Sequence, residues 1–162
     1  MPNHCENDLY IFGPNREAIR DQLRSTEGEP TPLTFRKIVP RPEILDHTIS
    51  GSQTEESLKI QKQAIAETGY ISWYEWSLAK WGTKWDAYRV TLSESQKRLK
   101  YKFETAWSPP EPVILALSKM FPKNKIKLCF FERGMAYQGR RVYLAGELIE
   151  TWDGEYHGNR GG

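Results

Sequence analysis

Residues 98–105 alternate between apolar and charged side chains, and this segment constrains the fold more than any other. Successive side chains of a β-strand point to opposite faces of the sheet, so a period of two predicts a strand with one buried and one solvated face. We expect Leu99, Tyr101 and Phe103 to be buried, and Arg98, Lys100, Lys102 and Glu104 to face water. Antiparallel sheets commonly leave one face in water, so the pattern favours an antiparallel sheet.

Short apolar or alternating runs predict the other strands, and helical spacing predicts helices between them. The expected strands cover residues 9–12, 33–39, 85–92, 125–131, 137–144 and 147–152, the last two as a hairpin turning at Ala145-Gly146. Helices are expected after Asn15, over 54–68 with Leu58 and Ile65 buried, over 70–81, and after a cap at Ser108-Pro-Pro-Glu111.

The order of these elements indicates an α+β fold. It contains more strands than a split βαββαβ unit needs, and the weakest of them is the one at 33–39. Assigning that strand to an insertion leaves a ferredoxin-like pattern, in which helices cover one face of an antiparallel sheet. We therefore expect a single domain over residues 1–152, with a helical insertion at about 50–82, a C-terminal hairpin, and a flexible polar tail at 153–162.

An aromatic stretch at residues 70–85 contains four of the six tryptophans. Gly82 can adopt φ > 0 at a helix end, so the helix is expected to stop near Trp81. Helical spacing divides its side chains into two adjoining stripes. We expect Tyr74, Leu78 and Trp81 to pack against the core, and Trp73, Trp76 and Lys80 to be more exposed. The exposed stripe is a candidate binding surface, with core packing as the alternative.

Composition excludes several classes of protein. A chain of 162 residues with 38% hydrophobic and 27% charged residues is typical of a soluble globular domain. The net charge of +2 excludes an acidic DNA mimic and gives no general attraction to nucleic acid. No apolar run approaches the roughly 20 residues that span a bilayer, and the N-terminus lacks the features of a secretory signal. We expect a cytoplasmic protein.

Motifs for catalysis or metal binding are missing from the sequence. There is no H-E-x-x-H, no phosphate-binding glycine loop and no nucleophile in a motif context. The two cysteines make no disulfide framework, and His4-Cys5 is the only pair of adjoining metal-ligand types. Glu104, Glu111 and Glu132 could approach in space, although each has a simpler structural role. We expect no enzymatic activity, no metal and no cofactor.

Five longer motifs are distinctive in combination: Pro2-Asn-His-Cys-Glu-Asn7, Trp73-Tyr-Glu-Trp76, Trp81-Gly-Thr-Lys-Trp-Asp86, Glu104-Thr-Ala-Trp-Ser-Pro-Pro110 and Phe131-Glu-Arg-Gly-Met135. Together they resemble the YubB/Api92-like family of phage and plasmid proteins. The resemblance covers about residues 2–150, and His4 departs from it by standing where the family has tryptophan. It implies a ferredoxin-like domain and a mobile genetic element acting in a host cell, and it implies no reaction.

Three functions are consistent with the resemblance and with cations placed near aromatic rings. The first is a non-enzymatic accessory protein that counters host defence by binding a small anionic, nucleotide-like ligand. The second is an inhibitor that binds a host defence protein through the aromatic helix, and the third is a single-stranded nucleic-acid binder. No membrane partner is expected, and the oligomeric state stays open. The candidate ligand-binding residues are Trp73, Trp76, Lys80, Lys84, Arg133, Tyr137 and Arg140.

Overall fold

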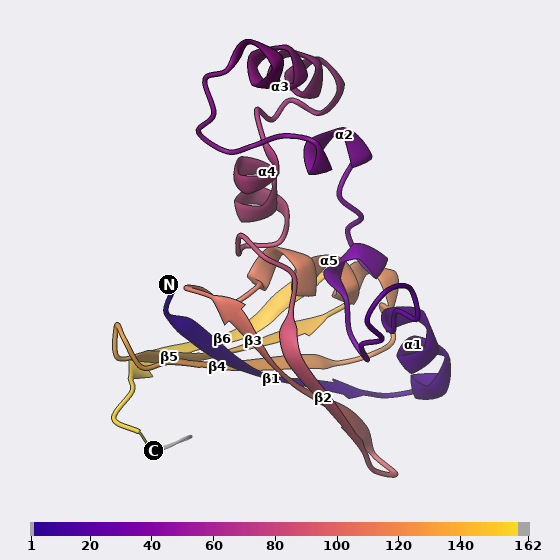
Figure 1. The fold of residues 1–162 in the computed structure, drawn as a ribbon. Coiled ribbons are helices and arrows are strands. Elements are labelled where there is room, and N and C mark those ends of the chain that lie inside the picture. The colour runs from indigo at the N-terminus through magenta and orange to yellow at the C-terminus, as the bar shows by residue number, and fades with distance from the viewer. Residues whose placement is uncertain (1, 159–162) are drawn as a thin grey trace.

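A six-stranded antiparallel sheet forms the base of the molecule, and its helices lie on one side (Figure 1). The computed structural model describes residues 2–158. The strands are β1 (His4–Phe12), β2 (Tyr88–Glu94), β3 (Arg98–Ala106), β4 (Ile126–Glu132), β5 (Tyr137–Leu144) and β6 (Glu147–Glu155). The helices are α1 (Arg16–Leu23), a 3-10 turn η1 (Phe35–Lys37), α2 (Glu43–Asp46), α3 (Glu55–Thr68), α4 (Trp73–Lys80) and α5 (Glu111–Met120).

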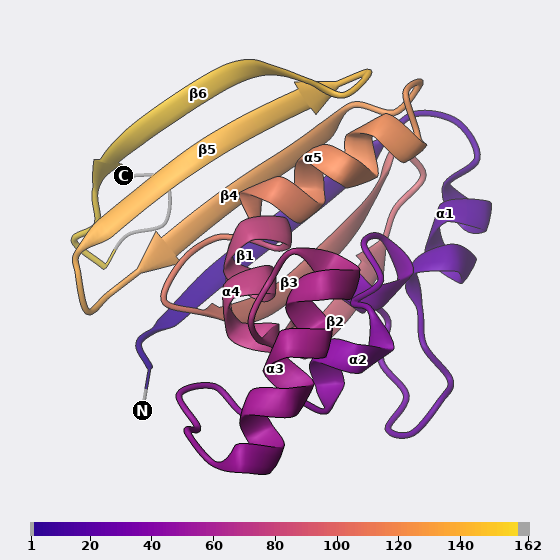
Figure 2. The same ribbon diagram turned by 90° about the horizontal axis from the view of Figure 1, so that it is seen from above.

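The strand order β2-β3-β1-β4-β5-β6 contains the ferredoxin-like order in its first four strands. α1 follows β1 and α5 connects β3 to β4, as in a βαββαβ unit. The hairpin of β5 and β6 extends the sheet beyond β4 (Figure 2). Its turn places Ala145 and Gly146 at φ 52° and 76°, the sign that a type I′ hairpin turn requires. The predicted α+β class, antiparallel sheet and terminal hairpin are confirmed.

The register predicted for β3 is also correct. Leu99, Tyr101 and Phe103 are buried on the helix-covered face, Lys102 is exposed and Lys100 is half-buried. They join one core with apolar residues of β1, β4, α1 and α5. The strand therefore separates a packed face from a solvated face, as its alternation indicated.

The strand expected at 33–39 is wrong, because this segment contains the 3-10 turn η1 instead. Asp86 holds the turn from a distant part of the chain. Its carboxylate accepts a hydrogen bond from the Thr34 hydroxyl at 2.6 Å and another from the Phe35 amide at 2.7 Å. Phe35 is then buried beneath the insertion rather than paired in the sheet.

Two strands differ from their expected extent or orientation. β1 begins at His4, five residues before the predicted start, because polar residues such as Asn7 take part in its pairing. In β2 a bulge lies between Tyr88 and Thr91, with Arg89 at φ 52°. The extra residue turns Tyr88 to the face opposite Leu92, although the alternation had placed both on one face.

The insertion rises from the helix-covered side of the sheet and contains α2, α3 and α4 (Figures 1 and 2). The stripe predicted to be buried in α3 is wrong, because Leu58 and Ile65 are exposed. The buried residues of α3 are Ser57, Gln61 and Ala64. Gln61 donates a hydrogen bond to the Ser52 carbonyl at 3.0 Å, so this helix is attached to the preceding loop by polar contacts that hydrophobic spacing does not reveal.

The burial predicted for the two aromatic stripes of α4 is partly wrong. Trp81 is buried as expected, at 1% exposed, but Trp76 is also buried, at 4%. Tyr74 and Leu78, expected in the core, are exposed. Trp81 follows the last helical residue, so its direction is set by the turn at Gly82 (φ 85°) and not by helical spacing.

The C-terminal segment is more ordered than the predicted tail. β6 continues to Glu155, and the Tyr156 ring packs on Phe131 with their centroids 5.6 Å apart. The end of the predicted tail, residues 159–162, lies outside the described residues.

Ser108 does not cap α5, because the cap position of this helix is Pro110. The Ser108 hydroxyl instead donates a hydrogen bond to the Gly82 carbonyl at 2.7 Å. No helix within residues 2–158 is long and apolar enough to cross a membrane.

Candidate functional site

The face of the sheet opposite the helices, here called the open face, carries a group of aromatic rings and cations. Pairing registers determine its membership, because directly paired residues point to the same side. Tyr10 of β1 is paired with Lys100 of β3 and with Lys127 of β4, and Phe12 is paired with Arg98. Their neighbours Leu9 and Ile11 point into the core, so these five polar and aromatic positions face away from it.

Three cations surround the Tyr10 ring. The Arg98 guanidinium carbon and the Lys127 Nζ each lie 4.6 Å from its centroid, and the Lys100 Nζ lies 5.3 Å away. The Phe12 ring is nearly parallel to that of Tyr10, with an interplanar angle of 14° and centroids 6.4 Å apart. We call Tyr10, Phe12, Arg98, Lys100 and Lys127 the Tyr10 cluster.

The charge around this cluster is strongly positive. Lys125 and Lys102 extend the row of cations on the same face, and Lys125 Nζ lies 5.7 Å from the Phe12 centroid. The acid nearest in register is Asp8, which is paired with Lys102. Burial raises the pKa of the Tyr10 phenol above its ordinary value, and the Asp8 carboxylate raises it further. Tyr10 is therefore a neutral ring at physiological pH, with five cations around it and Phe12.

Such a cluster can hold a planar group and an anion at once. Aromatic faces stack on nucleobases, and ammonium and guanidinium groups bind phosphate oxygens. The present cation–π contacts are each worth only about 0.5–1 kcal/mol when exposed. A ligand can therefore replace a lysine over the ring at small cost, and the displaced ammonium remains within reach of the ligand's phosphate.

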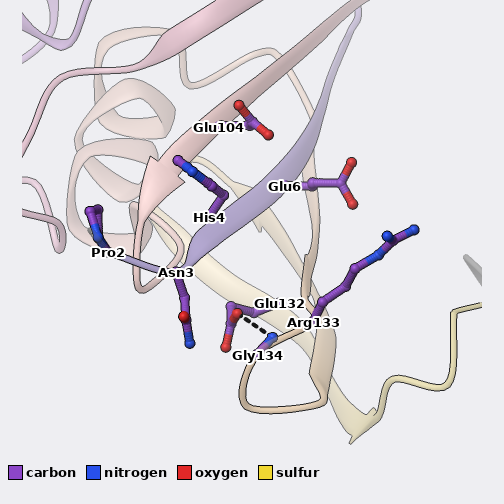
Figure 3. Close-up of a pocket in the computed structure, with 8 residues that line it drawn as sticks. All are labelled: Pro2, Asn3, His4, Glu6, Glu104, Glu132, Arg133 and Gly134. Carbon is purple, nitrogen blue, oxygen red and sulfur yellow. Dashed lines mark hydrogen bonds between the residues drawn. The ribbon is translucent and has the colours of Figure 1, made fainter.

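A cavity of about 430 Å³ lies at the other end of β1 (Figure 3). It is lined by Pro2, Asn3, His4, Glu6, Glu104, Glu132, Arg133 and Gly134. Glu6 and Glu104 are paired with each other on the open face and make this end acidic, in contrast to the Tyr10 cluster, whereas the buried Glu132 is paired with Cys5 on the helix-covered side. The open face therefore has an acidic end and a basic end, and a polyanion is favoured only at the basic one.

The ionisable groups of this cavity have structural partners. The Glu132 carboxylate accepts hydrogen bonds from the Gly134 and Met135 amides, both at 2.7 Å. Glu104 forms an ion pair with Arg89 at 2.6 Å, and His4 Nδ1 lies 2.6 Å from the Tyr88 hydroxyl. Within residues 2–158 no group of three His, Cys, Asp or Glu side chains could hold a metal ion. These contacts explain the carboxylates as parts of turns and ion pairs.

Neither of the other reactive groups considered in the sequence forms a nucleophilic site. Cys5 is buried, and burial raises the pKa of its thiol to about 12, so the reactive thiolate is scarce at physiological pH. Glu111 lies apart from the acidic cavity, in an ion pair with Arg141 at 2.5 Å. The alternative of a Glu104, Glu111 and Glu132 cluster is therefore not formed, and the separate structural roles preferred from the sequence fit better.

Four of the predicted site residues belong to the aromatic stretch. Trp76 is inaccessible to a ligand because it packs edge-to-face on Trp81, with centroids 5.3 Å apart. Trp73 is half-buried, and Lys80 is exposed with its Nζ 6.0 Å from the Tyr70 centroid. Lys84 Nζ lies 4.5 Å over the exposed Trp85 ring.

The other three predicted residues are divided between the ends and faces of β4 and β5. Arg133 is exposed at the turn and lines the acidic cavity. Tyr137 lies on the helix-covered side, where its hydroxyl donates a hydrogen bond to the Trp107 carbonyl at 2.6 Å. Arg140 is on the open face, paired with Cys129. Because α4 and Arg140 lie on opposite sides of the sheet, the predicted residues do not form one surface.

The Tyr10 cluster was missed at the level of sequence. The apolar run Leu9-Tyr-Ile-Phe12 by itself predicts a buried strand, although its alternation of aliphatic and aromatic residues is compatible with aromatic side chains on the other face. Lys125 and Lys127 alternate with Ile126 and Leu128 in the same way. The missing information was the pairing of β1 between β3 and β4, which brings residues about 90 and 117 positions away next to Tyr10.

Comparisons with known proteins identify the fold and the family. A family model described as the ferredoxin-like domain in Api92-like protein matches residues 80–160, half of the chain. The crystal structure of protein Api92 from Yersinia pseudotuberculosis is similar, with a TM-score of 0.62 and 11% identity. The superposition covers 98% of this chain and 99% of that one, and at this identity it supports the fold alone. No curated protein sequence matches the chain.

Proposed function

The chain belongs to the Api92-like family, and from this premise and the open face of its sheet we propose that it binds single-stranded nucleic acid there. The observation that carries the proposal is the Tyr10 ring with three cations within 5.3 Å of its centroid. In ferredoxin-like RNA-binding domains, aromatic rings on the open sheet face stack on the bases of a single strand. Tyr10 and Phe12 have the same position relative to the helices.

The shape of the surface favours an extended strand over a small free ligand. Small-molecule sites are concave and bury most of the ligand surface. Tyr10, in contrast, is a half-buried residue in the middle of a sheet face, with one side open to water. A flexible strand gains affinity from several weak stacking and phosphate contacts along such a surface, whereas a mononucleotide can use only one or two of them.

Duplex binding is disfavoured by the same geometry. The rings can stack only on bases that are unpaired and turned out, since the bases of a duplex are stacked on each other. The protein is proposed to act without catalysis, as the sequence suggested. Its expected role against host defence comes from the family resemblance alone, and nucleic-acid binding is compatible with that role.

A specific observation supports the protein-binding alternative. α4 and the residue preceding its cap present Ile71, Tyr74 and Leu78 to solvent, at spacings of three and four residues. Such a stripe is what a helix uses to bind a groove in a partner protein. It lies on the side of the sheet opposite the Tyr10 cluster, so the two functions can be tested by separate substitutions.

The experiment is a fluorescence-anisotropy titration of labelled 12-residue oligothymidine, oligouridine and a DNA duplex at several salt concentrations. We expect the single strands to bind more tightly than the duplex. The logarithm of the association constant should fall linearly with the logarithm of the salt concentration. Tyr10→Ala is expected to weaken binding by about 1–3 kcal/mol, the usual contribution of one stacked base. Lys100→Gln and Lys127→Gln are each expected to reduce the salt slope by about one.

Tyr74→Ala is the matched control, because it removes an exposed aromatic ring from the opposite side of the molecule. Equal binding of duplex and single strand, or normal binding by Tyr10→Ala, would contradict the proposal. Competition by a mononucleotide as strongly as by the 12-residue strand would favour the small-ligand alternative. A comparison of oligothymidine with oligouridine decides between DNA and RNA.

A further inference from the structure

We infer that Trp152 is a second stacking platform, so that the bound strand crosses the sheet from β1 to β6. This inference rests on the proposed function and extends the site to a residue that the sequence did not suggest. Trp152 is 42% exposed on the open face. Three features support this role: its register, the way its indole is held, and the local balance of charge.

The register gives the position of Trp152 relative to the Tyr10 cluster. Asp8 of β1 is paired with Cys129 of β4, Cys129 with Arg140 of β5, and Arg140 with Trp152 of β6. Trp152 therefore shares the open face with Tyr10. It lies three strands away, in register with Asp8, which is two residues from Tyr10 along β1. With strands about 4.8 Å apart and about 3.4 Å per residue along a strand, the Cα atoms of the two residues are separated by about 16 Å.

Gly154 makes room for the Trp152 indole against β6. A Cβ atom at Gly154 would be only 2.8 Å from Cζ2 and 2.9 Å from Cη2 of the indole. The six-membered ring thus occupies the space above the backbone that any other residue would fill. The indole is therefore seated against β6 while 42% of the residue is exposed, so part of the ring is open to a base. The Arg140 guanidinium lies over the ring, 5.9 Å from its centroid, so a base that stacks on that face replaces a cation–π contact.

The charges near Trp152 are balanced, which distinguishes this platform from the Tyr10 cluster. Glu150 on the same face forms an ion pair with Arg140 at 3.4 Å. Asp153 points to the helix-covered side and forms an ion pair with Arg141 at 2.8 Å. A ligand is therefore expected to gain base stacking at Trp152 with little net phosphate attraction, while the phosphate contacts come from the cations around Tyr10.

The path of the bound nucleic acid across the sheet is limited by the acidic end of the open face. Glu6 and Glu104 lie in the next row beyond Asp8, where a phosphate would be repelled. The path from Tyr10 across Lys127 and Arg140 to Trp152 avoids that row. A stacked strand rises about 3.4 Å per nucleotide, so at most about five nucleotides are needed to reach from one platform to the other.

The test is a length series of oligothymidines from 2 to 12 residues, bound to the wild type and to Trp152→Ala. We expect Trp152→Ala to weaken binding of the long oligonucleotides by roughly tenfold and to leave binding of the dinucleotide unchanged. Its salt slope is expected to equal that of the wild type, in contrast to Lys127→Gln. Trp152→Phe is expected to recover most of the affinity.

Gly154→Ala provides a second variant, because it displaces the indole without removing it. It is expected to weaken the binding of long oligonucleotides as Trp152→Ala does. Circular dichroism with thermal melting reports whether either variant is folded. Tyr74→Ala again serves as the control for removal of an exposed ring. If the wild type binds long strands and Trp152→Ala binds them equally well, or if Trp152→Ala lowers the salt slope, the inference is wrong while the proposed function stands. If the wild type binds no oligonucleotide at low salt, the proposed function fails first, and this inference with it.

Discussion

The two faces of the sheet each carry aromatic rings beside cations, but they use the combination differently. On the helix-covered face, the Arg41 guanidinium lies 5.2 Å from the Trp81 ring centroid and 5.9 Å from that of Trp73. It also donates hydrogen bonds to Ser77 Oγ at 3.1 Å and to Asp46 at 2.8 Å. Arg41 is thus a largely buried structural residue, with its side chain 14% exposed.

On the open face the cations around Tyr10 have flexible stems and face water. The Tyr10 and Phe12 rings on this face are nearly parallel, with an interplanar angle of 14°. Trp76 and Trp81, in contrast, meet edge-to-face at 81° and exclude solvent between them. The difference teaches that aromatic and basic composition alone does not identify a binding site. What matters is whether the polar partners of the cation come from the protein, as for Arg41, or from the solvent, where a ligand can replace them.

The largest effect expected from this comparison is on stability. Trp76→Ala and Trp81→Ala should each lower the free energy of unfolding by about 3–5 kcal/mol, because each empties a closely packed position in the core. Urea denaturation followed by circular dichroism measures both. Trp81→Ala additionally leaves the Val39 carbonyl without its 2.9 Å hydrogen bond from the indole.

Tyr74→Ala is the control for the tryptophan variants, since its ring is on the exposed stripe of the same helix and should change stability by no more than about 0.5 kcal/mol. A Trp76→Ala variant as stable as the wild type would show that this ring is accessible, as the helical spacing had suggested. It would restore α4 as a candidate ligand site.

A second prediction compares the two kinds of cation directly. Arg41→Ala should cost about 1–3 kcal/mol of stability, because the buried Ser77 hydroxyl loses a charged donor and two rings lose their cation. Arg98→Ala, on the open face, should leave the denaturation midpoint nearly unchanged. Equal destabilisation by the two substitutions would contradict the distinction between the faces.

The fold was predictable where the evidence is local. The alternation at 98–105 fixed the faces of β3, and Ala145-Gly146 marked the terminal hairpin, because strand period and turn conformation depend on neighbouring residues. The 3-10 turn at 35–37 was not predictable in this way, since its hydrogen-bond acceptor, Asp86, comes from 51 residues further along.

The site was less predictable, for a related reason. The orientation of α4 depends on contacts from outside the helix, such as the Trp73 amide to Thr48 Oγ1 at 3.0 Å and Arg41 to Ser77. The Tyr10 cluster likewise combines side chains from β1, β3 and β4. The alternation predicts Arg98 and Lys100 on the solvated face of β3, but only the pairing order places them beside the rings of β1.

A smaller effect is expected at the junction between the insertion and α5. Ser108→Ala should destabilise the protein by about 1 kcal/mol, because the hydroxyl donates to the Gly82 carbonyl at the end of the insertion. The magnitude equals that expected for a helix cap, but the consequence differs. Hydrogen exchange should rise around residues 81–83, whereas loss of a cap would raise it in the first turn of α5.

The smallest expected effect concerns the cations of the open face. The double variant Lys100→Gln, Lys127→Gln should have a denaturation midpoint close to that of the wild type, with a free-energy change of no more than about 0.5 kcal/mol, since both lysines are half-buried on the solvated face and glutamine keeps most of their packing stem. If these lysines repel one another, neutralising them can even stabilise the protein slightly at low salt, and that gain should vanish as salt screens the charges. Urea titrations at low and high salt measure the change in stability and its dependence on salt.

A loss of several kcal/mol would mean that the two lysines hold the sheet together as Arg41 holds the insertion, and the contrast between the faces would disappear. Unchanged or increased stability, with weaker oligonucleotide binding by the same variant, would separate the requirements of binding from those of folding on this face.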